Sequence, residues 1–129
     1  MWLNVDGQRV YAYTGGRVFD RSQPTVVFLH GAQHDHSVWI LQTRYLAHHG
    51  CAVLALDLPG HGRSAGAPLP TIEALAAWLV GVLDAADVER ATIVGHSMGS
   101  LIGLEFSGIA PERLSGLVLV GTAYPMKVS

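Results

Sequence analysis

Four short apolar runs, separated by polar and amphipathic stretches, constrain the fold more than any other feature of the sequence. They are rich in β-branched and aliphatic residues and lie at 25–29, 52–56, 91–94 and 117–120. A continuous apolar run of this length is typical of a strand buried on both faces. Because helical patterns separate the runs, we expect a mostly parallel sheet with flanking helices.

The segments around these runs complete the expected order of elements. Residues 2–14 alternate around Asp6-Gly7, which predicts an antiparallel hairpin and brings the sheet to about six strands. Three helices are expected: one from about 38 to 49 between a Ser37 N-cap and Gly50, one after Thr71, and one from 97 to just before Pro111.

Composition restricts the class of protein. The 129 residues are few enough for one domain, 1–129, and the net charge of −2 gives no basic field for nucleic acid. The longest apolar stretch, 74–83, is about half of a membrane-spanning helix, and the first residues do not resemble a secretion signal. The lone Cys51 cannot form an internal disulfide. We therefore expect a cytoplasmic protein that binds neither nucleic acid nor membrane.

The strongest chemical signal is Gly95-His96-Ser97-Met98-Gly99, a G-x-S-x-G motif between an expected strand and an expected helix. A sharp strand-to-helix turn projects a serine hydroxyl above the sheet, and flanking glycines avoid collisions there. The helix N-terminus supplies oriented N–H groups for a developing oxyanion. The alternative is that Ser97 is an ordinary N-cap in a glycine-rich turn.

Two further segments follow buried runs. His30-Gly31-Ala32 comes directly after residues 25–29, and 57–64 (Asp-Leu-Pro-Gly-His-Gly-Arg-Ser) comes after 52–56. Where a G-x-S-x-G turn carries a nucleophile, an N–H from the loop after the earlier strand pairs with the N–H that follows the nucleophile. The corresponding oxyanion-hole amides belong to Ala32 and Met98.

In this order, the three segments resemble the α/β-hydrolase family over essentially the whole chain. The resemblance implies that Ser97 is the nucleophile, that the Ala32 and Met98 amides form the oxyanion hole, that 57–64 is a structural turn, and that His96 shapes the site. A serine at this position resembles esterases, lipases, lactonases, carbon–carbon hydrolases and cofactor-free haloperoxidases. It departs from the epoxide hydrolases and haloalkane dehalogenases of this fold, which have aspartate there.

The catalytic partners of Ser97 are not evident in the sequence. In this fold an acid and then a histidine follow the nucleophile, but here no histidine follows Ser97, and the only later acids are Glu105 and Glu112. The chain therefore resembles the N-terminal portion of a hydrolase that lacks its cap and last strands. We expect residues 117–120 to form an exposed sheet edge, and the chain to associate with another copy or a complementing C-terminal chain, or to be marginally stable.

Other assignments of the polar residues remain open. His34 or His36 could replace the missing base, although solvated loop histidines are the simpler interpretation, and the pair could join His30 in a zinc site. Residues 60–65 fit a dinucleotide pattern but are followed by prolines rather than a helix. We expect no cofactor and no metal. Three residues could line a pocket or belong to the core: Trp39, Met98 and Tyr124.

The sequence thus predicts a serine hydrolase of carboxylic esters or related acyl substrates, with a small-molecule substrate and Ser97 as nucleophile. The alternative is a catalytically silent fragment or small-molecule binding module of the same fold. The missing histidine after Ser97 separates the two hypotheses, because a serine without a base is a weak nucleophile.

Overall fold

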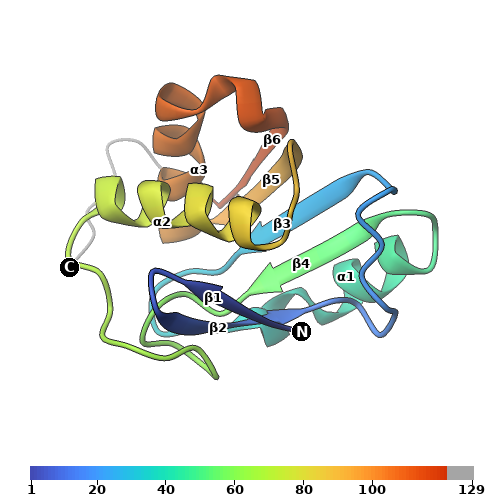
Figure 1. The fold of residues 1–129 in the computed structure, drawn as a ribbon, viewed down its shortest axis with the longest axis horizontal. Helices are drawn as coiled ribbons and strands as arrows, with labels where there is room; N and C mark the ends of the chain where they lie inside the picture. The colour runs from blue at the N-terminus through green and yellow to red at the C-terminus, as the bar shows by residue number, and fades with distance from the viewer. Residues whose placement is uncertain (122–129) are drawn as a thin grey trace.

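The computed structural model describes residues 1–121 and contains one six-stranded mixed sheet (Figure 1). The strand order is β1-β2-β4-β3-β5-β6. Strands β3, β4, β5 and β6 run parallel, whereas β1 pairs antiparallel with β2 and β2 antiparallel with β4. The bounds are Trp2–Val5, Gln8–Tyr13, Thr25–Leu29, Ala52–Leu56, Ala91–His96 and Leu114–Val120. The predicted fold class, including the N-terminal hairpin, is confirmed.

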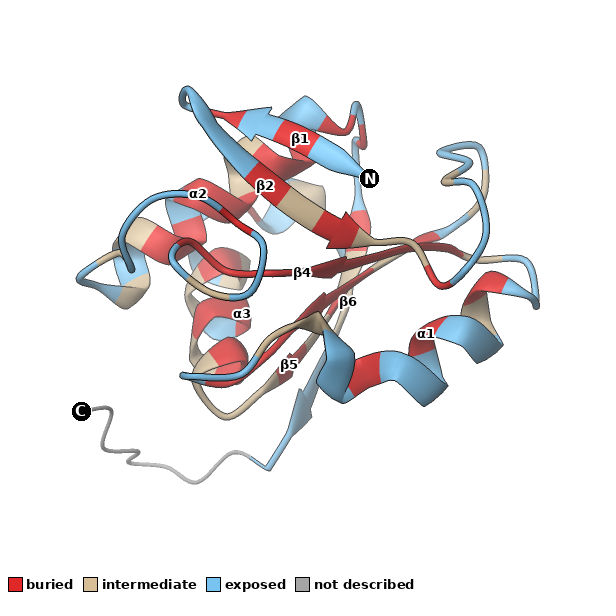
Figure 2. Cartoon of the chain, turned by 90° about the horizontal axis from the view of Figure 1, so that it is seen from below, coloured by how far each residue is buried: buried red, intermediate tan, exposed pale blue. Residues whose placement is uncertain are grey.

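Helices cover both faces of the sheet. Helices α2 (Ile72–Ala85) and α3 (Met98–Ile109) pack together on one face, and α1 (Ile40–Ala47) lies on the other (Figures 1 and 2). Two 3₁₀ turns, η1 (His36–Trp39) and η2 (Pro111–Arg113), precede α1 and β6. Within residues 1–121, no helix combines the length and apolar character needed to cross a membrane.

Burial on both faces explains the continuous apolar runs. In β3, Val27 and Leu29 belong to the large core beneath α2 and α3, whereas Phe28 belongs to a smaller core that includes Trp39 of η1. All five residues of β4 are buried (Figure 2). Alternation of side chains across a strand therefore places apolar groups in two separate cores.

The predicted start of the first helix is wrong in detail. The chain forms the 3₁₀ turn η1 before α1, and Asp35, not Ser37, is the N-cap. The Asp35 carboxylate accepts from the Ser37 amide at 2.8 Å and from its hydroxyl at 2.5 Å. The second helix begins after Thr71, as predicted, and Thr71 is its N-cap, since its hydroxyl accepts from the Ala74 amide at 3.0 Å.

The outer edge of β6 has no partner strand among the described residues, as predicted. Val118, Leu119 and Val120 at this edge are 38–48% exposed. Unpaired apolar edges invite pairing with another chain.

We propose that the chain self-associates through this edge, so Val118→Lys should shift the population toward monomer in light scattering. A monodisperse wild-type monomer over the same concentration range would count against the proposal.

Candidate active site

The turn after β5 places Ser97 in a strained backbone conformation at the start of α3. Its φ of 56° and ψ of −116° lie outside the regions that non-glycine residues ordinarily adopt. The Ser97 hydroxyl makes no capping hydrogen bond with α3. An ordinary N-cap serine has an extended backbone and caps the helix with its side chain. Ser97 occupies the N-cap position of α3 but has neither property, so the alternative of an ordinary N-cap serine does not fit.

Hydrogen bonds from both sides hold this conformation. The Ser97 amide donates to the Val120 carbonyl at 3.3 Å, which ties the turn to β6. The Ser97 carbonyl accepts from the Ser100 amide at 2.9 Å and from the Ser100 hydroxyl at 2.5 Å. The backbone of Ser97 is therefore fixed, while its side chain stays available for chemistry.

The two motif glycines permit close contact between backbones. A Cβ atom on Gly95 would lie 2.5 Å from the Gly99 carbonyl carbon, and one on Gly99 would lie 2.7 Å from the Leu29 carbonyl carbon. Real Cβ atoms essentially never approach so closely. Gly95 thus lets α3 start directly over β5, and Gly99 lets α3 pack onto the end of β3.

The loop after β3 reaches the Ser97 turn. A Cβ atom on Gly31 would lie 3.4 Å from the Ser97 Cβ and 3.6 Å from Nδ1 of His96. The His96 ring also faces Gly121, where a Cβ would lie 3.2 Å from Nε2. His96 therefore lies between Gly31 in the loop after β3 and Gly121 directly after β6, a position compatible with the shaping role that the resemblance implies.

The two predicted oxyanion-hole residues line one pocket. Ala32 and Met98 border a cavity of about 350 Å³ whose other walls come from the turn after β4 and from the start of α2. Most of its lining is apolar, including Leu58, Leu69 and Ile72. Of the predicted pocket residues, Met98 lines this cavity, Trp39 instead lies in the smaller core, and Tyr124 lies outside the described residues.

His30 is fully buried and joins two loops next to the site. Its Nε2 accepts from the Leu58 amide at 3.0 Å, and the remaining proton on Nδ1 lets it donate to the Gly31 carbonyl at 2.6 Å. The bond from Leu58 requires a neutral imidazole, since a protonated Nε2 cannot accept, whereas the bond to Gly31 can form in either protonation state. Burial lowers the pKa of His30 below its ordinary value of 6.5, although the bond to Gly31 opposes this.

This depressed pKa predicts a loss of stability in acid. Below about pH 6.5 the unfolded chain binds a proton at His30 more readily than the folded chain, so the free energy of unfolding falls as pH decreases through that value. Urea denaturation at pH 7.5 and 5.5 should show a larger loss for the wild type than for His30→Gln. Equal losses would contradict the assignment.

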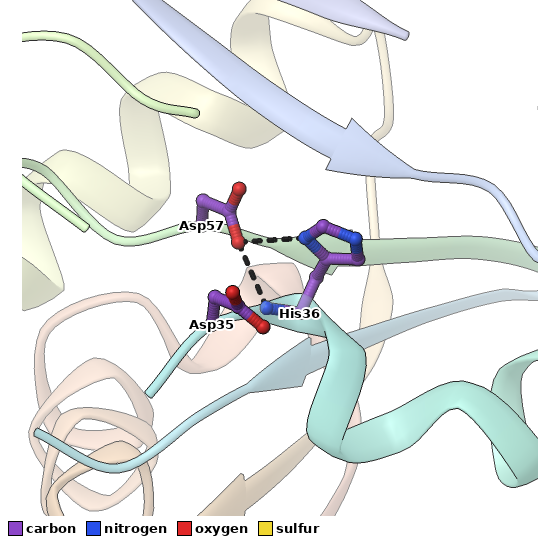
Figure 3. A group of neighbouring side chains, drawn as sticks. All are labelled: Asp35, His36 and Asp57. Atoms are coloured by element: carbon purple, nitrogen blue, oxygen red, sulfur yellow. Dashed lines mark hydrogen bonds and ion pairs between the residues drawn. The ribbon is translucent and has the colours of Figure 1, made fainter. Parts of the chain in front are cut away.

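His36 and Asp57 form a hydrogen-bonded pair that the sequence did not reveal. The fully buried Asp57 accepts through Oδ1 from the His36 amide at 2.8 Å and from His36 Nδ1 at 2.9 Å (Figure 3). The His36 ring lies 5.0 Å from the Tyr11 ring and 5.6 Å from the Tyr13 ring, both on β2. The expectation that His36 is a solvated loop histidine is therefore wrong, whereas His34 is exposed as expected.

The predicted zinc alternative does not match the arrangement of the ligands. His30 uses both ring nitrogens in hydrogen bonds. Asp35 lies near His36 and Asp57 (Figure 3), but its carboxylate accepts twice from Ser37, and hydrogen bonding to Ser37 lowers the Asp35 pKa. The ring nitrogens of His30 and the carboxylates of Asp35 and Asp57 therefore already have hydrogen-bond partners within the chain, and their placement does not require an ion.

The segment 57–64 forms a turn rather than a nucleotide-binding helix start. Its Asp57 accepts through Oδ2 from the Arg63 amide at 2.9 Å, and the Ser64 hydroxyl donates to the Asp57 carbonyl at 2.6 Å. The next helix, α2, begins only at Ile72. Because a dinucleotide fingerprint needs a helix directly behind its glycines, the turn interpretation is the one that fits.

Neither later acid lies where it could serve Ser97. Glu105 is on α3, and Glu112 is in η2, which precedes β6. The strands β5 and β6 are parallel neighbours, so the N-terminal end of β6, which follows Glu112, is far from the C-terminal end of β5, where Ser97 lies. The described residues therefore bring no acid from beyond Ser97 to its turn.

Comparisons with known proteins agree with this architecture. A sequence profile described as alpha/beta hydrolase fold matches residues 24–129. The chain is 38% identical over 124 residues to the dihydrolipoyllysine-residue acetyltransferase component of the acetoin cleaving system of Cupriavidus necator, covering 92% of this chain and 31% of that protein. It is 34% identical over 125 residues to epoxide hydrolase B of Mycobacterium tuberculosis, covering 95% of this chain and 35% of that protein.

A solved structure extends the likeness to three dimensions. The crystal structure of a membrane phospholipase A, a bacterial virulence factor, superposes with a TM-score of 0.85 at 27% identity, covering 98% of this chain and 41% of that one. The chain thus spans 31%, 35% and 41% of these three proteins. With the profile match and the sheet order together, we conclude that this chain belongs to the alpha/beta hydrolase fold family.

Proposed function

We propose that this chain carries the nucleophile and oxyanion hole of a serine hydrolase that acts on carboxylic esters or related acyl substrates. The single observation that supports this most is the geometry of the Ser97 turn. The φ of Ser97 is positive, its hydroxyl makes no capping hydrogen bond, and the loop that contains Gly31 lies beside it. Strain at a non-glycine residue is typical of functional sites. Membership of a hydrolase fold family is consistent with the same chemistry.

The proposed reaction starts with attack of Ser97 Oγ on the substrate carbonyl carbon. A base takes the hydroxyl proton, and the carbonyl electrons move to oxygen, where the Ala32 and Met98 amides donate. As the first residue of α3, Met98 has an N–H without a partner in the helix. The alcohol leaves with a proton, and water then hydrolyses the acyl ester on Ser97.

The serine favours acyl substrates over epoxides, although epoxide hydrolases are among the relatives. Attack of a hydroxyl on an epoxide carbon forms an ether, and an ether has no carbonyl carbon for water to attack. Attack on an acyl carbon forms an ester, which water can hydrolyse. A serine nucleophile at residue 97 therefore supports turnover of acyl substrates but not of epoxides.

We further propose that the base and acid come from residues or a chain beyond 1–129. No histidine follows Ser97, and the matched stretch covers only 31% and 35% of the two relatives. The substrate in this proposal is a small molecule, and the apolar pocket beside Ala32 and Met98 suits an apolar acyl or alkyl group.

A fluorophosphonate probe tests the proposal, because its phosphorus reacts with activated serines. Ser97 Oγ forms the new bond to phosphorus, fluoride leaves, and the hydroxyl proton goes to a base. We expect intact-mass and peptide analysis to find one phosphonyl group on Ser97, with faster labelling when imidazole supplies an external base. Ser97→Ala should abolish labelling, whereas Ser107→Ala, which alters another serine of α3, should not.

A second candidate is a small-molecule binding module, which the missing histidine favours. This candidate predicts a folded chain that binds ester-like ligands but leaves the probe intact with or without imidazole. That outcome would reject the hydrolase proposal for this chain.

A further inference from the structure

The loop that joins β3 to η1 is fastened at both ends to the residues directly after β4. At its start, the Leu58 amide donates to His30 Nε2 at 3.0 Å. At its end, the His36 amide donates to Asp57 Oδ1 at 2.8 Å. Asp57 and Leu58 are adjacent and fully buried, so one short stretch of chain holds both ends of the loop.

The middle of the loop has little support of its own. Ala32, Gln33 and His34 are exposed, and a backbone hydrogen bond from the His34 amide to the Gly31 carbonyl, at 3.2 Å, spans them. Gln33 adopts a positive φ of 63°. The direction of the Ala32 amide therefore depends on how firmly the two ends are held.

The anchor itself is rigid, because Asp57 is held from several directions. Its amide donates to the Tyr11 carbonyl at 3.0 Å, its carbonyl accepts from the Ser64 hydroxyl at 2.6 Å, and its Oδ2 accepts from the Arg63 amide at 2.9 Å. The Ser64 oxygen in turn accepts from the Tyr11 amide at 2.9 Å. The bonds to Tyr11 tie the anchor to β2, and the bonds to Arg63 and Ser64 fix it within its own turn.

We propose that His30 and Asp57 are positioning residues, which clamp the 30–36 loop so that the Ala32 amide points at the oxyanion formed by Ser97. The proposal rests on the proposed function, since it needs Ser97 to be the nucleophile. An oxyanion hole works only when its donors lie about 2.7–3.1 Å from the developing charge, so a small drift of the loop lowers the rate. The clamp acts on the reaction step rather than on binding of the reagent.

Two measurements on the full chain test the clamp. Amide hydrogen exchange, resolved by NMR, reports on residues 31–36, and fluorophosphonate kinetics give a maximal rate of labelling and a half-saturating concentration. In Asp57→Asn and His30→Gln we expect faster exchange in the loop and a maximal labelling rate lowered by up to about 100-fold, with the half-saturating concentration unchanged. His36→Ala keeps the backbone bond to Asp57 and should give a smaller change.

Val82→Ala is the control for general destabilisation. Val82 lies on α2, is fully buried in the large core, and its apolar side chain takes no part in the hydrogen bonds that hold the clamp. We expect it to lower the free energy of unfolding while exchange in the loop and labelling stay close to wild type. If Asp57→Asn fails to fold, His30→Gln and His36→Ala still decide the question.

The outcomes separate the clamp from the proposed function. A wild type that labels at Ser97 while folded clamp variants keep wild-type exchange and labelling would overturn the clamp alone. Equal loss of labelling in Val82→Ala would also overturn it, since general destabilisation would then explain the effect. A folded wild type that never labels would overturn the proposed function and the clamp with it.

Discussion

Gly99→Ala should destabilise the chain by about 2 kcal/mol or more, because it forces a methyl group against the end of β3. The new Cβ would lie 2.7 Å from the Leu29 carbonyl carbon and 2.9 Å from the Leu29 Cβ. Neither atom can rotate away, since one is backbone and the other is attached directly to it. Urea denaturation monitored by circular dichroism should show a lower midpoint or no cooperative transition.

Gly108→Ala is the control on the same helix. No atom lies within 4 Å of a Cβ at Gly108, which is exposed near the end of α3. Alanine favours helix over glycine by up to about 1 kcal/mol, so this variant should match or exceed wild-type stability. Equal destabilisation by the two substitutions would show that close packing of α3 on β3 is not what requires Gly99.

Asp57→Ala should lower the free energy of unfolding by about 3–5 kcal/mol. Removal of the carboxylate leaves three donors without their acceptor: the His36 amide, His36 Nδ1 and the Arg63 amide. The site is fully buried, so water cannot easily replace the lost acceptor. The loss should appear in urea denaturation at neutral pH.

The neighbouring carboxylate of Asp35 gives the comparison. Asp35 also accepts two hydrogen bonds, but both come from Ser37 at the exposed start of η1. Asp35→Ala should therefore cost about 1 kcal/mol, the usual loss for a helix cap. A cost for Asp57→Ala no larger than that for Asp35→Ala would contradict the structural role assigned to the buried pair.

The sheet could be predicted from the sequence because its strands are buried on both faces. Residues 25–29 and 52–56 are the bounds of β3 and β4 in the structure as well. Strand β6 starts earlier than predicted, at Leu114, since Ser115 and Gly116 interrupt the apolar pattern without ending the ladder to β5. The positive φ of Asp6 and Gly7 agrees with the predicted hairpin turn.

Local capping was harder to predict, because Asp35 and Ser37 are both good caps two residues apart. Only the structure shows that Asp35 is the N-cap, with its carboxylate accepting from the amide and the hydroxyl of Ser37. The strained turn at Ser97 was predictable, since its glycines are needed at fixed positions next to the serine.

The contacts of His36 depend on tertiary packing that periodicity does not encode. Its partner Asp57 is 21 residues away, and its ring lies beside tyrosines of β2. A signal was present in Asp57, a carboxylate directly after a fully apolar strand and before Leu58. Charged groups at such positions are rarely buried unless they are paired, so the sequence could have indicated that Asp57 has a hydrogen-bonding partner, although not which residue it is.

A crystal structure of the chain after reaction with a fluorophosphonate would show which atom is the nucleophile and which amides face the oxyanion. We expect a covalent bond from phosphorus to Ser97 Oγ, with the phosphoryl oxygen about 2.7–3.1 Å from the amide nitrogens of Ala32 and Met98. Attachment to another residue, or a phosphoryl oxygen directed away from both amides, would contradict the role proposed for the Ser97 turn.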